Sequence, residues 1–237
     1  MKSASGYERS AHLYDLFDRK ENVEFFYRYA AEAGEALDIG AGTRRIAIPL
    51  ARRGVAVWCV EPSPAMRREF QRKQEKEPDL REGNTLVAGD AASFDLGRTF
   101  PAAFLSGSFD HLLDDEARLS ALGTVRRHLS PGGVLVFDIF LGLMEEGPLA
   151  PAGVVETAEG EVRRFVGGRM LPGERKETRL VFEVLERGDV VERIEERSVV
   201  GITTREAIHE LLERTGFELR REWGDYDFAP YRPGDAL

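Results

Sequence analysis

The chain has 237 residues, of which 42% are hydrophobic, and a formal net charge of −9. This size and composition suit one α/β domain, or one domain with an insertion. The negative charge argues against binding to a phosphate backbone, so no nucleic-acid partner is expected.

A single cysteine, Cys59, excludes an internal disulfide and fits a reducing compartment. Residues 1–20 lack the apolar core that a signal peptide needs. No apolar run is long enough to span a bilayer. We therefore expect a cytoplasmic protein with no membrane partner.

Helical and strand-like patterns alternate through the first 140 residues. A helical face over residues 21–33 is followed by short apolar runs that predict strands, with helical patterns between them. The predicted strands cover residues 36–39, 55–60, 85–90, 102–108 and 134–140, and the predicted helices between them cover 46–54, a segment starting at Ser63, and 114–129. This alternation predicts an α/β fold with a doubly wound, mostly parallel sheet of Rossmann-like type.

The alternation stops after Phe140. Residues 161–200 are charged and strand-like, and the Arg-Gly-Asp sequence at 187–189 has the composition of a hairpin turn. We therefore predict a Rossmann-like core in residues 1–140 and an antiparallel β cap in residues 141–200.

Residues 201–237 are predicted to return to the core. Thr203 and Glu206 have the spacing of a capping box, which predicts a helix that ends at Gly216. Residues 217–228 are predicted to form a sixth strand. No apolar segment follows that could supply a seventh.

Four features fall at the carboxyl ends of predicted strands or in the turns beside them, and ligands of such sheets bind outside those strand ends. They are Asp38-Ile-Gly40-Ala41-Gly42, Glu61, Gly89-Asp90-Ala91 and the His-Leu-Ser-Pro-Gly-Gly turn at 128–133. Glycines let a backbone approach a ligand closely, and a carboxylate such as Glu61 can accept both hydroxyls of a ribose. Taken singly, a tight turn or a solvated charge explains each feature as well.

Together, the order and spacing of these features resemble class I S-adenosylmethionine-dependent methyltransferases, from about Tyr14 to Phe140. The segment from Phe109 to Phe140 is similar to small-molecule members of that family. The cap resembles the antiparallel insertions of sugar-amine and glycine-type N-methyltransferases. A nicotinamide-binding Rossmann domain is the rival, but the third glycine of its fingerprint would fall at Arg45.

The resemblance implies an enzyme that transfers a methyl group from S-adenosylmethionine to a nitrogen or oxygen of a small molecule. It implies that Tyr14 closes over the cofactor. It implies that the methionine part contacts Asp38, Gly40, Ala41 and Gly42, and that the ribose lies beside Glu61, Pro62 and Met66. It further implies that the adenine lies beside Asp90 and Ala91, and the methyl group beside Leu105 and Ser106.

An acceptor hydroxyl or ammonium must lose a proton, and His111 is the first candidate for the base. Tyr14 and Tyr226 are further catalytic candidates. His111 could instead be a loop histidine that only packs, and Tyr14 a buried aromatic anchor. The sequence shows no metal-ligand cluster, so no metal is expected.

The chain departs from the family pattern at Arg44, which replaces the third glycine of the loop. We expect Arg44 to point to solvent or to the cofactor carboxylate, and Arg45 to be an ordinary helix residue. The alternative function is a degenerate relative that binds cofactor or a metabolite without turnover. The exposed strand edge expected in the cap leaves room for a homodimer formed through it.

Overall fold

The computed structural model describes residues 7–17, 22–77, 83–140 and 146–235. Five parallel strands form its larger sheet, in the order β3-β2-β1-β4-β5. They are β1 (Glu35–Ile39), β2 (Ala56–Glu61), β3 (Asn84–Ala88), β4 (Phe100–Leu105) and β5 (Leu129–Phe137). The strand order reverses between β1 and β4, so this sheet has a topological switch point there.

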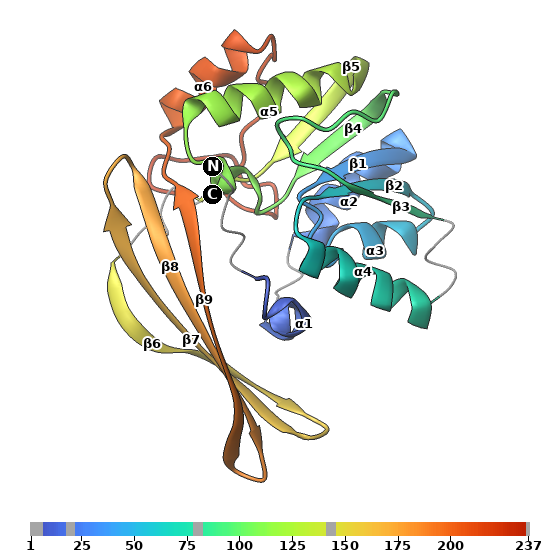
Figure 1. The fold of residues 1–237 in the computed structure, drawn as a ribbon. Helices are drawn as coiled ribbons and strands as arrows, with labels where there is room; N and C mark the ends of the chain where they lie inside the picture. The colour runs from blue at the N-terminus through green and yellow to red at the C-terminus, as the bar shows by residue number, and fades with distance from the viewer. Residues whose placement is uncertain (1–6, 18–21, 78–82, 141–145, 236–237) are drawn as a thin grey trace.

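Helices cover both faces of the parallel sheet (Figure 1). The helices of the described residues are α1 (Ala11–Tyr14), α2 (Val23–Ala33), α3 (Ala47–Ala51), α4 (Pro64–Lys76), α5 (Asp115–Arg127) and α6 (Arg205–Arg214), with short 3₁₀ turns η1 (Asp15–Phe17) and η3 (Phe109–His111). Helix α1 is not one of those that cover the parallel sheet. Among the described residues no helix is long and apolar enough to cross a membrane.

Successive side chains of a strand point to opposite faces of the sheet, so they pack against different helices. Ala36 of β1 and Phe104 of β4 face α2 and α3, where the fully buried Phe26 packs against Phe104 at a centroid distance of 5.3 Å. Leu37 and Leu105, one residue further along, face the layer that contains α5. The site at the carboxyl edge therefore stands on a core that is packed on both sides.

A second, antiparallel sheet follows the core in sequence, with the order β6-β7-β8-β9. Its strands are β6 (Gly147–Thr157), β7 (Gly160–Leu171), β8 (Arg175–Glu186) and β9 (Asp189–Gly201). Arg187 and Gly188 both have left-handed backbones, with φ of 52° and 93°, as a two-residue hairpin turn requires. The predicted fold class, a Rossmann-like parallel sheet with an antiparallel β cap, is confirmed.

Several element boundaries differ from the sequence-based expectation. Helix α3 has only five residues and contains Pro49, which lacks the backbone donor that a longer helix would use. Helix α6 begins one residue later than predicted, because Thr204 supplies the capping hydroxyl that accepts from the Ala207 amide at 3.2 Å.

The predicted sixth strand over residues 217–228 is wrong. This segment contributes only an isolated bridge between Trp223 and Pro230. The carboxylate of Asp225 accepts from the amides of Asp227 and Ala229, which folds the chain into a tight turn. Its aromatic side chains instead pack on α2, and the rings of Phe228 and Phe25 stack at 4.8 Å.

Helix α1 lies between the two sheets, as Figure 1 shows. Ala11 and Tyr14 pack against Met66 of α4. Leu13, on the opposite side, is buried in a cluster with residues of the cap sheet. The amino-terminal segment is thus a connection between the core and the cap.

Candidate functional site

The loop after β1 is held by its own backbone and by the neighbouring strand. Gly40 and Gly42 have φ of 74° and 55°, a region that favours glycine. The amides of Gly40 and Ala41 both donate to the carbonyl of Val60, at 2.8 and 3.2 Å. A Cβ added to Gly40 would lie 2.6 Å from Cβ of Ser108, so this position has no room for a larger residue.

Glu61, the last residue of β2, braces the same loop. Its two carboxylate oxygens accept from the amides of Gly42 (2.8 Å) and Ser63 (2.7 Å). Burial raises the pKa of Glu61, and these two hydrogen bonds oppose that shift. Each carboxylate oxygen can accept more than one hydrogen bond, so Glu61 keeps acceptor capacity for a ligand.

A small cavity of about 30 Å³ opens at the switch point between β1 and β4. It is lined by Tyr14, Asp38, Gly40, Ala41, Gly42, Thr43, Arg45, Ile46 and Ser106. We call it the loop cavity. Six of the residues predicted for cofactor binding from the sequence are brought together here, from the amino-terminal segment, the glycine loop and the end of β4.

Asp38 is the acid of the loop cavity. Its side chain is 2% exposed, and burial raises its pKa to about 7, while the guanidinium of Arg45 opposes the shift. No hydrogen bond to the Asp38 carboxylate is found within the described part of the chain. A buried carboxylate without such bonds favours a cationic partner.

Arg45 faces the loop cavity as part of a polar network, and the prediction that it is an ordinary helix residue is wrong. It precedes α3 and donates to Oδ1 of Asn22 and to Oγ of Ser106, the latter at 2.8 Å. Ser106 in turn donates to Asp138 at 3.2 Å, and the hydroxyl of Tyr226 donates to the same carboxylate oxygen at 2.8 Å. The network anchors Arg45 beside Asp38.

Arg44 does not point to solvent or into the loop cavity, so that expectation is also wrong. Its backbone has a left-handed conformation that favours glycine, with φ of 78°, and its side chain is 1% exposed. The guanidinium carbon lies 3.0 Å from the ring centroid of Phe70 in α4. Within the described residues, none of its three side-chain nitrogens has a hydrogen-bond partner. Burial lowers the pKa of Arg44 to about 10.

The remaining residues predicted for the cofactor lie around the loop cavity or apart from it. Met66 is buried beneath Tyr14. Leu105 points into the core on the α5 side, so its side chain does not border the cavity as predicted. The carboxylate of Asp90 is exposed and accepts from the Ala92 amide at 2.9 Å.

Two other predicted residues border strand ends. Pro62 is exposed directly after β2, and its carbonyl accepts from Arg67. Ala91 follows β3 and packs against the core cluster that contains Phe94. Their predicted roles beside the ribose and the adenine are not tested by these positions.

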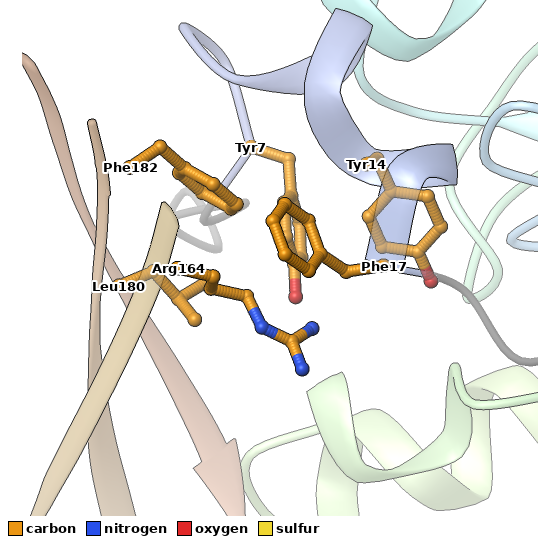
Figure 2. Close-up of a pocket in the computed structure, with 6 residues that line it drawn as sticks. All are labelled: Tyr7, Tyr14, Phe17, Arg164, Leu180 and Phe182. Carbon is orange, nitrogen blue, oxygen red and sulfur yellow. The ribbon is translucent and has the colours of Figure 1, made fainter. Parts of the chain in front are cut away.

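A second cavity, of about 210 Å³, lies between the amino-terminal segment and the cap sheet. Figure 2 shows its lining, with Tyr7, Tyr14 and Phe17 on one side and Arg164, Leu180 and Phe182 on the other. We call it the cap cavity. Tyr14 lines both cavities, so the two share a wall.

The two other candidate catalytic side chains lie outside the linings of these cavities. His111 ends η3, just beyond β4, and burial lowers its pKa. Tyr226 is bound to Asp138, and burial together with that carboxylate raises the pKa of its hydroxyl. Both roles remain predictions. Among the described residues, no group of acids, histidines and cysteine is arranged to hold a metal.

Comparison with known proteins identifies the part of the chain that carries this site. Residues 36–133 match the family model of the methyltransferase domain. This match includes the glycine loop, Glu61 and Asp90. An uncharacterized methyltransferase from Bacillus cytotoxicus is 30% identical to the chain over 142 residues, which cover 55% of this chain and 64% of the relative. The match therefore spans less than two thirds of the length of that relative.

Solved methyltransferases have the same fold over nearly the whole chain. An S-adenosylmethionine-dependent methyltransferase from Clostridium acetobutylicum superposes with a TM-score of 0.80 at 19% identity, covering 97% of this chain and 95% of the other. A sugar N-methyltransferase from a Streptoalloteichus species gives 0.78 at 24% identity, covering 100% and 93%. The expected resemblance to methyltransferases is borne out over residues 36–133, and the Rossmann-like fold is confirmed.

Several residues in or beside the two cavities were not predicted from the sequence. Asp138 carried a usable signal, because it interrupts the apolar run of the predicted fifth strand near its carboxyl end, the same sheet edge as Asp38 and Glu61. Asn22 and Arg164 carried none. Nothing in the sequence places Asn22 beside Ser106, which is 84 positions away. Nothing in it places Arg164 beside the amino-terminal segment.

The burial of Arg44 leads to a testable prediction. We expect Arg44→Met to raise the free energy of unfolding by about 1 kcal/mol or more, because it removes buried donors that lack acceptors while keeping a long side chain on Phe70. Urea unfolding at pH 7 measures this. Arg53→Met is the control, since Arg53 also stacks on an aromatic ring but is exposed and paired with Glu24. A destabilised Arg44→Met variant would contradict the interpretation.

Proposed function

We propose that this protein transfers a methyl group from S-adenosylmethionine to a nitrogen or oxygen of a small molecule. One observation carries the proposal: the loop cavity at the switch point presents one buried carboxylate, Asp38, and one guanidinium, Arg45. The amino-acid end of S-adenosylmethionine has one ammonium and one carboxylate. The two charges of the site therefore match the two charges of the ligand.

The other residues of the site fit the same ligand. The Gly40–Gly42 loop has the close backbone approach that a cofactor needs, and the space beside Gly40 is too tight for a Cβ. Glu61, with spare acceptor capacity, would hold the ribose hydroxyls. Asp90, exposed at the end of β3, would accept from the adenine amino group. Tyr14 would cover the methionine part from the amino-terminal side.

The cap cavity supports a small organic acceptor. Its volume of about 210 Å³ lies below the usual size of a drug-like pocket, and its lining is mostly aromatic and aliphatic. Because it shares Tyr14 with the loop cavity, an acceptor there would lie next to the cofactor. The similarity to a sugar N-methyltransferase supports an amino sugar as the first acceptor to test.

The reaction requires the protein chiefly to position the cofactor and the acceptor. S-adenosylmethionine, when bound, supplies an already activated methyl group, and displacement then requires a nucleophile held in line and close. The residues of this chain would orient the two ends of the cofactor through Asp38, Arg45 and Glu61. The aromatic wall of the cap cavity would exclude water. His111, neutral near pH 7 because burial lowers its pKa, would take the acceptor proton.

The position of Arg44 bears on the alternative, a relative that binds without turnover. Two departures from the family pattern kept that alternative open: Arg44 in the loop and the lack of an apolar segment for a seventh strand. Arg44 packs on Phe70 outside the lining of the loop cavity. The position of Arg44 therefore does not favour an inactive site.

Cofactor binding is the direct test. We expect S-adenosylhomocysteine to bind the wild type in calorimetry, and Glu61→Ala to weaken it about ten- to a hundredfold, the effect of losing hydrogen bonds to a charged group. Glu35→Ala is the control, because this partly exposed residue starts β1 at the opposite edge of the sheet. Equal affinity in the Glu61→Ala variant would remove Glu61 from the site.

The raised pKa of Asp38 predicts a pH dependence. The carboxylate must be ionised to hold the cofactor ammonium, and with a pKa of about 7 it is mostly protonated at pH 6. Affinity for S-adenosylhomocysteine should therefore be about tenfold weaker at pH 6 than at pH 8. Asp38→Asn should bind weakly and show a flatter profile. A wild-type affinity that is constant from pH 6 to 8 would contradict the role of Asp38.

The role of His111 as the base is tested in a methyl-transfer assay with a panel of amino sugars. The assay measures the S-adenosylhomocysteine that is released. We expect His111→Gln to lower kcat about a hundredfold or more and to leave cofactor affinity unchanged, since proton transfer contributes about 10² to 10⁴ in rate. Because burial lowers the pKa of His111, the wild-type kcat, measured at saturating cofactor, should persist below pH 6.5. His209→Gln on α6 is the control. An unchanged kcat in His111→Gln would exclude it as the base.

A further inference from the structure

The amino-terminal segment formed by residues 7–17, which we call the strap, joins the methyltransferase core to the cap. Figure 2 shows its aromatic side chains directed at the cap cavity. Tyr14 lines both cavities, and Tyr7 and Phe17 line the cap cavity. The position of the strap therefore determines the shape of both cavities.

Polar side chains hold the strap to the core. Asp15 accepts from the hydroxyl of Thr43 at 2.5 Å and is paired with Lys73 of α4. Glu8 accepts from the hydroxyl of Ser63 at 2.9 Å. These contacts place the strap across the glycine loop and the start of α4, on the same side as the predicted cofactor residues.

One side chain of the cap, Glu196 of β9, holds the strap from the other side. Its carboxylate accepts from three successive backbone amides, those of Glu8 (3.1 Å), Arg9 (2.6 Å) and Ser10 (2.6 Å). Glu196 is 8% exposed, and Ser10 is fully buried. The three bonds run to an ionised acceptor, and such hydrogen bonds are about twice as strong as neutral ones.

The arrangement sets a geometric link from Glu196 to Tyr14. The three amides immediately precede α1, and α1 ends at Tyr14, one helical turn further on. Leu13 and Phe17 add apolar contacts to the cap, with the Phe17 and Phe182 rings 5.8 Å apart. A charge-assisted anchor and an apolar contact thus lie on either side of Tyr14 in the sequence.

We propose that Glu196 is a positioning residue for the methyltransferase reaction. By binding three amides of the strap, it holds Tyr14 as the common wall of the loop cavity and the cap cavity. The cap thereby acts on the cofactor site without touching the cofactor. This inference rests on the proposed function for its effect on cofactor binding, but the anchoring itself does not depend on it.

The experiment compares Glu196→Gln with the wild type. The amide that replaces the carboxylate has one acceptor oxygen and a donor group facing the strap amides. We expect hydrogen exchange at residues 8–10 to speed up by tenfold or more and S-adenosylhomocysteine affinity to fall about tenfold. The urea unfolding midpoint of the cap and core should stay near that of the wild type, which separates positioning from loss of fold.

Two further variants keep the outcome decisive. Glu195→Gln is the matched control, because Glu195 precedes Glu196 on the opposite face of β9 and pairs with Arg179 at 2.7 Å; it should change neither readout. Glu196→Asp keeps the charge and should restore part of the protection if Glu196→Gln folds poorly. The losses in affinity of Glu196→Gln and Tyr14→Ala should not add, since both act through Tyr14.

Each result decides a separate point. Unchanged exchange at residues 8–10 in Glu196→Gln overturns the anchor. Faster exchange with unchanged affinity overturns the positioning role, and so does a fully additive double variant. A wild type that does not bind S-adenosylhomocysteine contradicts the proposed function instead, and the exchange data then decide the anchoring of the strap alone.

Discussion

The parallel pairing of β1 with β4 is the constraint on which the site depends. It places Leu37 opposite Ala103 and Asp38 opposite Phe104, so both strands end at one edge of the sheet. Because helices cover opposite faces on either side of this pair, the chain leaves an opening at that edge. Ser106, which follows β4, meets the glycine loop and Arg45, which follow β1, although Arg45 and Ser106 are 61 residues apart. Without this pairing, Ser106 would not hold Arg45 beside the Asp38 carboxylate.

Buried polar groups then define the site more than apolar packing does. Glu61 braces the glycine loop through two amides, and Asp138 gathers Ser106, Tyr226 and the amide of Gly107. Each carboxylate is removed from water, which raises its pKa, and each is compensated by hydrogen bonds. Asp38 differs, because it has a raised pKa without such bonds in the described residues. This difference makes Asp38 the group with the strongest need for a ligand charge.

Arginine has two different roles in adjacent positions of one loop. Arg44 has the backbone conformation of a glycine and buries its side chain against Phe70, whereas Arg45 turns back toward Ser106 and the loop cavity. The sequence-based expectation was that Arg44 points to solvent or to the cofactor carboxylate and that Arg45 is an ordinary helix residue. The structure instead buries Arg44 on Phe70 of α4 and places Arg45 in the lining of the loop cavity. The strap crosses this loop, where Asp15 accepts from Thr43 and Tyr14 lines the loop cavity, and the cap packs against the strap.

Local patterns were sufficient for the parallel core and for much of the site. Apolar runs that end in Asp38 and Glu61, and turn residues such as Arg187-Gly188, depend on neighbours a few positions away, so the sequence alone determined them. The family and the fold followed from their order. Only the tertiary structure decided that residues 217–228 fold back as an aromatic turn, that Arg45 and not Arg44 faces the cavity, and that Glu196 binds the strap. These features depend on contacts between distant segments, such as Glu8 with Glu196, 188 residues apart, and Tyr29 with Trp223, 194 residues apart. The free energy of such contacts depends on burial and geometry that no local pattern encodes.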